Sequence, residues 1–242
     1  MAAPSLLPPL RDAFDSPERK RAYVRGLFAT IADRYDLITV LLSFGLDRRW
    51  KNRLVALSGA GPGKRALDLA CGTGDIAFQV AASGARTTGL DVTTRMLQLA
   101  RAKAPAGPAS FVAGDMMALP FPEHSFDLVT SGYGLRNVPA IEPALAEISR
   151  VLKPGGLFLS LDFNRPASFP VRWVYLGHLT LVGSLLGWVL HRNPDTYRYI
   201  PESIRRYPGA PRVCGIALEQ GFRQCNWLPV LGGLMAIHKA LK

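Results

Sequence analysis

Short apolar runs alternate with amphipathic stretches through the middle of this 242-residue chain. The amphipathic stretches predict helices at 75–83, 93–104 and 140–152. The apolar runs predict strands at 65–70, 86–91, 109–113, 126–131 and 156–162, and a closing pair within 221–240. Alternation of this kind is typical of a parallel sheet that helices cover on both faces. We therefore predict an α/β fold with an open, doubly wound, mostly parallel seven-stranded sheet.

The sequence outside this region predicts helical additions to a single domain. Residues 1–15 contain Pro4, Pro8 and Pro9, which disfavour a helix, and we expect a flexible tail there. Residues 16–242 are expected to form one domain. Its parts are N-terminal helices at 16–58, a cofactor-binding core at 64–163, a helical lid insertion at 167–207 and C-terminal strands at 210–242.

A glycine-rich turn, LDLACGTGD at 67–75, lies where the first predicted strand passes into a helix. Gly72 and Gly74 match the spacing of the dinucleotide-binding fingerprint, which is a weak signal alone. Asp91 ends the second strand, where a carboxylate that binds ribose hydroxyls is expected. Ligands of such sheets bind at the carboxyl ends of the strands, so the turn marks a cofactor site.

The charges around this turn decide which cofactor is expected. Asp68 precedes the glycines, Asp75 begins the following helix, and Asp115 follows the third strand. Poorly solvated carboxylates would repel a pyrophosphate by several kcal/mol, whereas they attract a sulfonium and an ammonium. S-adenosylmethionine carries both cations. In the alternative interpretation, Asp75 is only a helix N-terminal acid and Asp68 only accepts hydrogen bonds from backbone amides.

The expected contacts follow from the positions of these residues. Asp91 would accept the ribose hydroxyls, and Gly72 and Gly74 would let the backbone approach the methionyl part of the cofactor. Asp115 and Met116 lie where the adenine amine and ring face should fall.

Eight segments that span nearly the whole chain carry a family resemblance. They are VRGLFATIADRYD (24–36), LLSFGLDRRWK (41–51), LDLACGTGDIA (67–77), GDMMALPFPEHSFD (114–127), GLRNV (134–138), EISRVLKPGG (147–156), DTYRYIPESI (195–204) and GGLMAIHKA (232–240). The sequence resembles the ubiquinone/menaquinone biosynthesis C-methyltransferase family, within the class I S-adenosylmethionine-dependent methyltransferases. This resemblance implies a Rossmann-like fold and S-adenosylmethionine as methyl donor. Among the family's cofactor contacts, it carries over those at Thr73, Asp91, Asp115 and Met116.

Three positions depart from the family pattern. Gly132 stands where the family has a serine that contacts the cofactor, so that contact is not carried over. Thr39 and Asp47 stand where asparagine and histidine are usual. These two departures concern the substrate face and not the reaction class.

The resemblance further implies methyl transfer to a ring carbon of a prenylated quinol. We favour demethylmenaquinol, which would give menaquinol in the last step of menaquinone biosynthesis. The alternative is a 2-methoxy-6-polyprenyl-1,4-benzoquinol in ubiquinone biosynthesis.

Three residues are catalytic candidates. Arg136 is expected to lower the pKa of the quinol hydroxyl by its charge, directly or through an ordered water, and Asn137 to orient the ring oxygen. Arg136 has the alternative role of a surface salt bridge to Asp127 or Glu142. Tyr35 either folds over the site or is a core contact at helical spacing.

Residues 173–190, WVYLGHLTLVGSLLGWVL, contain no Asp, Glu, Lys or Arg. This length is at the threshold of a membrane span. The stretch contains His178 and three glycines and interrupts a soluble sheet between its fifth and sixth strands, which argues against a span. A buried helix is a second interpretation. We favour the third, a lid that contacts a long polyprenyl tail.

The net charge of +11 indicates a polyanionic partner, either nucleic acid or an anionic membrane. We expect a cytoplasmic protein in peripheral contact with an anionic membrane, with no nucleic acid partner. A homodimer is left open. The four histidines form no ligand cluster, so no metal is expected. The three cysteines are odd in number, which favours a reducing environment over a disulfide framework.

Two rival functions remain. An RNA methyltransferase would explain the charge, but SGYGLRN after the fourth strand lacks the polar-Pro-Pro-aromatic motif of base N-methylation. RNA carbon methylation commonly needs a cysteine beside proline, and no proline adjoins the cysteines here. A basic membrane- or RNA-binding module with a vestigial cofactor site is the other rival, and the intact LACGTGD segment argues against it.

Overall fold

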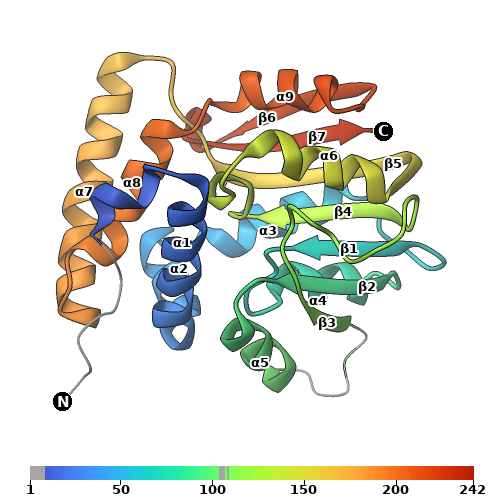
Figure 1. Cartoon of the computed structure of the whole chain (residues 1–242), viewed down its shortest axis with the longest axis horizontal. Helices are drawn as coiled ribbons and strands as arrows, with labels where there is room; N and C mark the ends of the chain where they lie inside the picture. Colours follow the sequence, from blue (N-terminus) through green and yellow to red (C-terminus); the bar gives the residue numbers. More distant parts are fainter. Residues whose placement is uncertain (1–8, 104–106, 108) are drawn as a thin grey trace.

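The computed structural model describes residues 9–103, 107 and 109–242. Its centre is one seven-stranded sheet with the order β3-β2-β1-β4-β5-β7-β6 (Figure 1). The strands are β1 (Arg65–Leu69), β2 (Arg86–Asp91), β3 (Ala109–Ala113), β4 (Phe126–Gly132), β5 (Leu152–Phe163), β6 (Gln224–Val230) and β7 (Met235–Leu241). Neighbouring strands from β3 to β5 pair in parallel, and β7 is antiparallel to both β5 and β6. The predicted sheet is confirmed.

Helices precede, connect and follow the strands. They are α1 (Pro17–Ile31), α2 (Tyr35–Leu42), α3 (Asp47–Leu57), α4 (Asp75–Ala82), α5 (Thr94–Lys103), α6 (Ile141–Val151), α7 (Phe169–His191), α8 (Asp195–Arg206) and α9 (Ala210–Glu219). Short 3-10 helices are η1 (Leu10–Phe14), η2 (Ala32–Arg34), η3 (Leu135–Asn137) and η4 (Leu231–Gly233). The three predicted core helices agree with α4, α5 and α6 to within one residue at each end.

Both faces of the sheet bury apolar side chains. On one face, Leu54 of α3 and Ile76 of α4 pack against alternate residues of β1, β4 and β5. On the other, Leu145 of α6 and Ile216 of α9 pack against the opposite set. Because helices cover both faces of these strands, side chains on both faces are buried, which explains the nearly continuous apolar runs of the sequence.

A separate helical layer covers the carboxyl ends of the parallel strands. Figure 1 shows α1, α2, α7 and α8 together at the left of the sheet. Tyr23 and Leu27 of α1 share a buried cluster with Tyr197 and Tyr199 of α8. Because the layer has its own core, the N-terminal helices and the insertion after β5 form one unit above the cofactor loop.

The predicted flexible tail at 1–15 differs from the structure in its last part. Residues 1–8 lie outside the described residues, whereas η1 packs on the helical layer. Ala13 is buried, and the ring of Phe14 stacks on Tyr199 with their centroids 5.7 Å apart. The prolines precede this turn and leave Phe14 free to bury its ring.

The predicted strand segment at 210–242 and the expected free cysteines also need correction. Residues 210–219 form α9, which begins with proline in its first turn and buries Val213 and Ile216. Cys214 of this helix forms a disulfide with Cys225 of β6, with 5.1 Å between their Cα atoms. The odd cysteine count misled the prediction because Cys71 alone is the free, buried cysteine of the described chain.

Helix α7 packs along α8 through two of its glycines. A Cβ atom at Gly187 would lie 2.5 Å from the carbonyl oxygen of Asn193, and one at Gly183 would lie 3.2 Å from Tyr197. Among the described helices, α7 is long and apolar enough, by length and composition alone, to cross a membrane. In this fold one side of it faces α8 and the other is exposed.

Candidate functional site

The glycine-rich loop between β1 and α4 holds Asp91 in place. Gly72 and Gly74 have positive φ values of 54° and 92°, which favour glycine. The Gly72 amide donates to Oδ2 of Asp91 at 2.9 Å, and the Thr93 amide donates to Oδ1 at 2.8 Å. Each oxygen of Asp91 keeps a lone pair, so this buried carboxylate can still accept two ribose hydroxyls.

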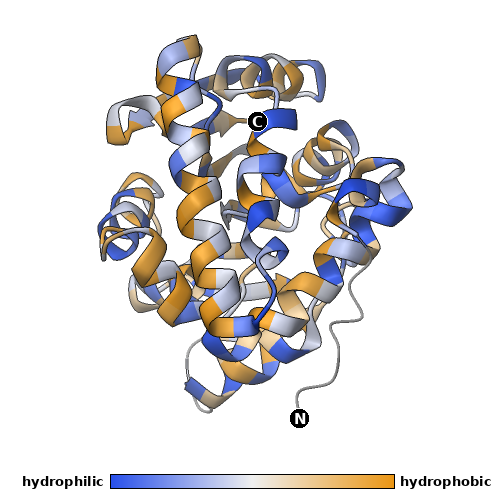
Figure 2. Ribbon diagram, turned by 90° about the vertical axis from the view of Figure 1, so that its left-hand side faces the viewer, coloured by the Kyte–Doolittle hydropathy of each residue, from blue (hydrophilic) through white to orange (hydrophobic). Residues whose placement is uncertain are grey.

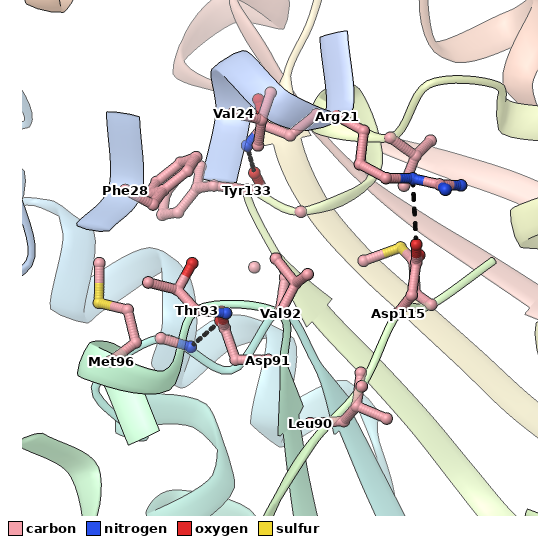
Figure 3. Close-up of a pocket in the computed structure, with 18 of the residues that line it drawn as sticks. Arg21, Val24, Phe28, Leu90, Asp91, Val92, Thr93, Met96, Asp115 and Tyr133 are labelled. Atoms are coloured by element: carbon pink, nitrogen blue, oxygen red, sulfur yellow. Dashed lines mark hydrogen bonds and ion pairs between the residues drawn. The ribbon is translucent and has the colours of Figure 1, made fainter. Parts of the chain in front are cut away.

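Asp91 lines a cleft of about 730 Å³ that has apolar walls suited to a purine (Figure 3). Leu90, Val92, Met96 and Met116 line its walls. Met116 thus lines the same cleft as Asp91, and its contact with adenine stays a prediction.

Helix α1 forms the roof of this cleft. Val24 and Phe28 line it from above, and Nε of Arg21 lies 3.3 Å from Oδ2 of Asp115 (Figure 3). The sequence gave us no sign of this roof, because contacts between α1 and the loop after β3 join residues almost a hundred positions apart.

Asp68 has an oxygen without a conventional partner. It is buried at the end region of β1, and its Oδ1 accepts a hydrogen bond from Thr130 at 2.8 Å. Oδ2 has no hydrogen bond within the usual limits of distance and angle from the described residues, although the backbone amide of Ala77 lies close enough to act on the carboxyl. Burial raises the pKa of Asp68 to about 7. Gly72, Thr73 and Asp68 line the same small recess, so an ammonium group placed there would satisfy the unpaired oxygen.

The other two acids of the predicted site are paired. Asp75 accepts hydrogen bonds from Lys51 at 2.9 Å and Lys103 at 3.2 Å, and Asp115 pairs with Arg21. The two lysines lower the pKa of Asp75 although its burial acts in the opposite direction. Repulsion of a dianion therefore comes mainly from Asp91, and from Asp68 where the pH is high enough to ionise it.

Thr73 lies in the loop and is tied to α2. Its hydroxyl donates to Oδ1 of Asp36 at 2.6 Å, and Lys103 pairs with Oδ2 of Asp36 at 2.8 Å. A Cβ atom at Gly72 would lie 3.7 Å from the ring of Tyr35. Tyr35 and Asp36 thus lie over the cofactor loop.

Lys51, which the sequence analysis missed, joins the loop to a buried network. Its Nζ lies 2.6 Å from Asp47 and 2.9 Å from Asp75. The hydroxyl of Tyr133 donates to Asp47 at 2.7 Å. Burial acts to lower the pKa of Lys51, but Tyr35 and the two carboxylates raise it above its ordinary value. Asp47, which stands where histidine is usual in the family, therefore holds both Lys51 and Tyr133.

The departure at Gly132 has a steric basis. A Cβ atom there would lie 2.6 Å from Cδ1 of Ile76. Ile76 is buried in the core beneath the cofactor loop, so a serine would require it to move.

A second, larger cavity of about 1330 Å³ lies beneath the helical layer. Its walls are mostly apolar and come from α1, α2, α7, α8 and the start of β7. The two cavities share four lining residues, which are Phe28, Tyr35, Tyr133 and Asn137. These four side chains therefore mark the place where a cofactor and an apolar substrate would meet.

Arg136 lines the large cavity and is buried. Its Nε lies 3.1 Å from Oδ1 of Asp162, and its backbone amide donates to Oδ2 at 2.9 Å. Burial raises the pKa of Asp162, and the guanidinium opposes that shift. The expected alternative, a surface salt bridge to Asp127 or Glu142, is wrong, because Arg136 is buried and pairs with Asp162. Asp127 pairs with Lys153 at the other end of β4.

Asn137 and Tyr35 also line the large cavity, so the structure brings the three catalytic candidates together. Nδ2 of Asn137 donates to the carbonyl oxygen of Tyr133 at 2.7 Å. This bond fixes the amide between the two cavities. The ring of Tyr35 lies 6.1 Å from that of Phe28, and burial raises the pKa of Tyr35 to about 12.

Tyr199 is a further candidate that the sequence analysis did not single out. It lines the large cavity, is 2% exposed, and its hydroxyl has no hydrogen-bond partner among the described residues. A buried hydroxyl without a partner is costly, and a ligand oxygen would satisfy it. The only signal for it was the segment DTYRYIPESI, which carried the resemblance without showing which tyrosine faces the site.

Comparison with known proteins places this site in a family. The model of the ubiE/COQ5 methyltransferase family matches residues 16–242. The chain belongs to the ubiE/COQ5 methyltransferase family. It is similar to the "Ubiquinone/menaquinone biosynthesis C-methyltransferase UbiE" of Paracoccus denitrificans, with 38% identity over 92% of each chain. The same-named protein of Ectopseudomonas mendocina is also 38% identical, over 94% of this chain and 92% of that one.

Solved structures agree on the fold of this ubiE/COQ5 family member. Magnesium protoporphyrin IX methyltransferase from Synechocystis, solved with bound SAH, superposes with a TM-score of 0.65 at 17% identity. The match covers 92% of this chain and 99% of that one. A SAM-dependent methyltransferase from Thermotoga maritima gives the same score at 18% identity, over 90% and 99% of the two chains. The ubiE/COQ5 family member is thus a Rossmann-like methyltransferase that uses S-adenosylmethionine.

Proposed function

We propose that this methyltransferase transfers a methyl group to a ring carbon of a prenylated quinol. One observation carries the proposal: an apolar cavity of about 1330 Å³ meets the cofactor cleft at Phe28, Tyr35, Tyr133 and Asn137. A quinol ring at this junction would have room for its polyprenyl tail in the cavity. The names of the relatives, which refer to ubiquinone and menaquinone biosynthesis, support the same substrate class.

The cofactor supplies an electrophilic methyl group on a sulfonium. We propose that Asp91 holds its ribose, that Asp68 and Thr73 lie beside its amino-acid part, and that Gly72 and Gly74 let the backbone come close. Met116 and Asp115 would hold the adenine. The protein's task is then to place a ring carbon in line with the methyl group, and orientation of this kind contributes roughly 7–11 kcal/mol.

Arg136 is the proposed electrostatic group for the quinol. The ring carbon becomes nucleophilic when an adjacent hydroxyl loses its proton to water, and a nearby guanidinium favours the resulting phenolate. The carbon then attacks the methyl group while the S–CH3 bond breaks, and the methylated carbon releases its own hydrogen as a proton to water, which restores the aromatic ring. Asp162 fixes the guanidinium and offsets part of its charge. Among the described residues that line the large cavity there is no Asp or Glu, so a phenolate would meet no carboxylate there. Asn137 and the free hydroxyl of Tyr199 would orient the ring oxygens.

The mostly apolar wall of the large cavity fits a polyprenyl chain. Tyr175, His178 and Leu179 of α7 line the cavity, which supports a role for this helix as lid. Phe44, 78% exposed, lines the same cavity and stacks on His178 at 6.5 Å. We place the mouth of the cavity at these two rings, and we propose that the protein is cytoplasmic and takes its substrate from a membrane by peripheral contact.

Demethylmenaquinol is the substrate we favour, and the benzoquinol precursor of ubiquinone is the alternative. The test incubates the purified protein with labelled S-adenosylmethionine and either reduced quinol, and counts the label in the lipid phase. We expect label in the naphthoquinol. Label in the benzoquinol alone would overturn the menaquinone assignment and keep the reaction class.

A third tube with total RNA serves as the control for the rival function. Transfer to RNA, with none to either quinol, would overturn the proposal. A Tyr35→Phe variant run beside the wild type distinguishes a hydroxyl contact from ring packing, because it keeps the ring between the two cavities.

A further inference from the structure

A third hollow lies on the outer side of the helical layer, apart from both cavities. It is a groove of about 1200 Å³ between α7 and α8. Thr180 and Leu181 of α7 line it, whereas Tyr175, His178 and Leu179 line the large cavity. None of the residues that line the groove lines the cofactor cleft or the large cavity. One side of helix α7 therefore lines the groove, and another side lines the large cavity.

The groove is strongly cationic. Four arginines line it, Arg165, Arg172, Arg198 and Arg205, and no described residue of its lining is acidic. Arg198 and Arg205 lie seven residues apart on α8, so they face the same side of that helix. Arg165 and Arg172 come from the turn before α7 and from its first turns.

These arginines are available to an anion. Within the described part of the chain, Arg165 and Arg172 form no ion pair, and Arg172 lies over the ring of Phe169 at 5.7 Å. Arg198 pairs with Asp195 and Arg205 with Glu202, each within one helical turn. Both of these arginine side chains are about half exposed, so the pairs are weak and open readily to a competing phosphate.

The rim of the groove is apolar and exposed. Trp173 is 72% exposed, Leu181 73% and Trp188 65%, all on α7. Figure 2 looks onto this side of the molecule. A row of exposed large apolar side chains marks an interaction surface, and tryptophan is favoured at the boundary between a membrane and water.

We propose that this groove binds the phosphate of an anionic phospholipid in a bilayer, with the outer side of α7 lying in the membrane interface. The arginines match the headgroup charge, and the apolar rim matches the acyl region beside it. RNA would use the same arginines, and Trp173 and Trp188 offer rings on which bases stack. The exposed aliphatic side chains beside them on α7, Leu181, Leu185 and Val189, favour the acyl region of a bilayer, because they have no ring for a base.

The proposal rests on the membrane contact proposed above and names an anionic phospholipid as the partner. Its test measures binding and does not require methyl transfer. The wild type is floated with vesicles of phosphatidylcholine, with and without one quarter phosphatidylglycerol. We expect binding to the anionic vesicles and much less to the neutral ones. The variant Arg165→Glu/Arg172→Glu should lose about tenfold or more of the anionic binding.

The matched control carries the same change of charge elsewhere. Arg86 and Arg223 are exposed at the amino ends of β2 and β6, at the edge of the sheet opposite the helical layer. Arg86→Glu/Arg223→Glu should change the binding by less than about twofold if the groove is specific. Equal losses in both double variants would overturn the site and leave only general attraction by the net charge.

Two further measurements complete the test. The fluorescence of Trp173 and Trp188 should be quenched by lipids brominated in the acyl chain, and a Trp173→Phe/Trp188→Phe variant should lose that quenching. Binding of inorganic phosphate or of single-stranded RNA through the same arginines, without binding to vesicles, would overturn the proposal. S-adenosylhomocysteine affinity and thermal unfolding of each variant report whether it has folded, so failure of the groove is distinguished from failure of the quinol reaction.

Discussion

Asp68 is the residue whose protonation controls the charge of the cofactor recess. Burial raises its pKa to about 7, and its Oδ2 has no conventional partner. If this oxygen faces the cofactor's ammonium, the protein must release the proton before it binds. At pH 6 roughly one tenth of Asp68 is ionised, so the Kd of S-adenosylhomocysteine should rise about tenfold per pH unit below 7 and level off above about 8. Calorimetric titrations between pH 5.5 and 8.5 measure this slope.

Asp68→Asn should bind more weakly above pH 7 and show a flat profile. Asp127→Asn changes a partly exposed acid at the opposite end of β4, whose pKa is lowered, and should keep the slope. A persistent slope in Asp68→Asn would assign the titration to another group.

Asp68 should also make the stability of the fold depend on pH, with a sign opposite to that of cofactor binding. An unfolded chain releases the proton of Asp68 near pH 4, whereas the folded protein keeps it until about pH 7. Ionisation therefore costs the folded state free energy as the pH rises from about 4 to 7. Relative to the wild type, Asp68→Asn should gain free energy of unfolding across this window, as urea titrations at several pH values would measure.

Tyr199 tests the quinol site with little risk to the fold. Removing an unpaired buried hydroxyl is expected to be neutral or slightly stabilising, because no hydrogen bond is lost. Tyr199→Phe should nevertheless raise KM for the quinol or lower kcat, by about fivefold to tenfold for one lost hydrogen bond.

Tyr207→Phe is the matched control. The hydroxyl of Tyr207 is also buried without a partner, but the residue lines neither cavity. Steady-state kinetics of the two variants should differ, and equal kinetics would remove the Tyr199 hydroxyl from substrate binding.

At the level of elements, α7 depends on two glycines and not on the third. A Cβ atom at Gly187 would lie 2.5 Å from a backbone oxygen of the turn before α8, whereas one at Gly177 would meet no atom within 4 Å. Gly187→Ala should therefore destabilise the protein by about 1–3 kcal/mol through overpacking. Gly177→Ala should stabilise it by about 0.5–1 kcal/mol, because alanine favours a helix. Thermal unfolding of the two variants measures the difference, and equal shifts would mean that α8 yields to the new methyl group.

The whole molecule couples the cofactor to the helical layer. Helix α1 roofs the cleft and shares a buried core with α8 through Tyr23 and Tyr199, whose rings lie 5.6 Å apart. S-adenosylhomocysteine should therefore slow amide hydrogen exchange in α1 and also in α8, which lines no part of the cleft. Helix α9, on the far part of the sheet, should exchange at an unchanged rate. Protection confined to the loop after β1 would mean that the roof moves independently of α8.

Sequence reasoning reached the features that depend on nearby residues. The loop around Gly72 and the position of Asp91 follow from one strand–turn–helix unit and the strand after it, and the sheet follows from the alternation that repeats it. Arg136 was a catalytic candidate from the sequence, but its partner Asp162 was not expected, because η3 and β5 meet only in the folded protein.

The same limit explains the other omissions. Lys51 reaches Asp75 from a helix on one face of the sheet, and Arg21 reaches Asp115 from the N-terminal layer. Neither ion pair leaves a pattern in a single sequence. The exposed side of α7 looked like any apolar helix, because the arginines that border its groove come partly from α8.

Four residues, Phe28, Tyr35, Tyr133 and Asn137, form a wall common to both cavities. A substitution in this wall should change the binding of both ligands at once. These four residues therefore have little freedom to adapt to a new quinol without weakening cofactor binding. Thr39, Leu42 and Phe44 line the large cavity alone. Evolution of substrate range in this protein is therefore expected to act through α2 and the turn after it, where the family departure at Thr39 already lies.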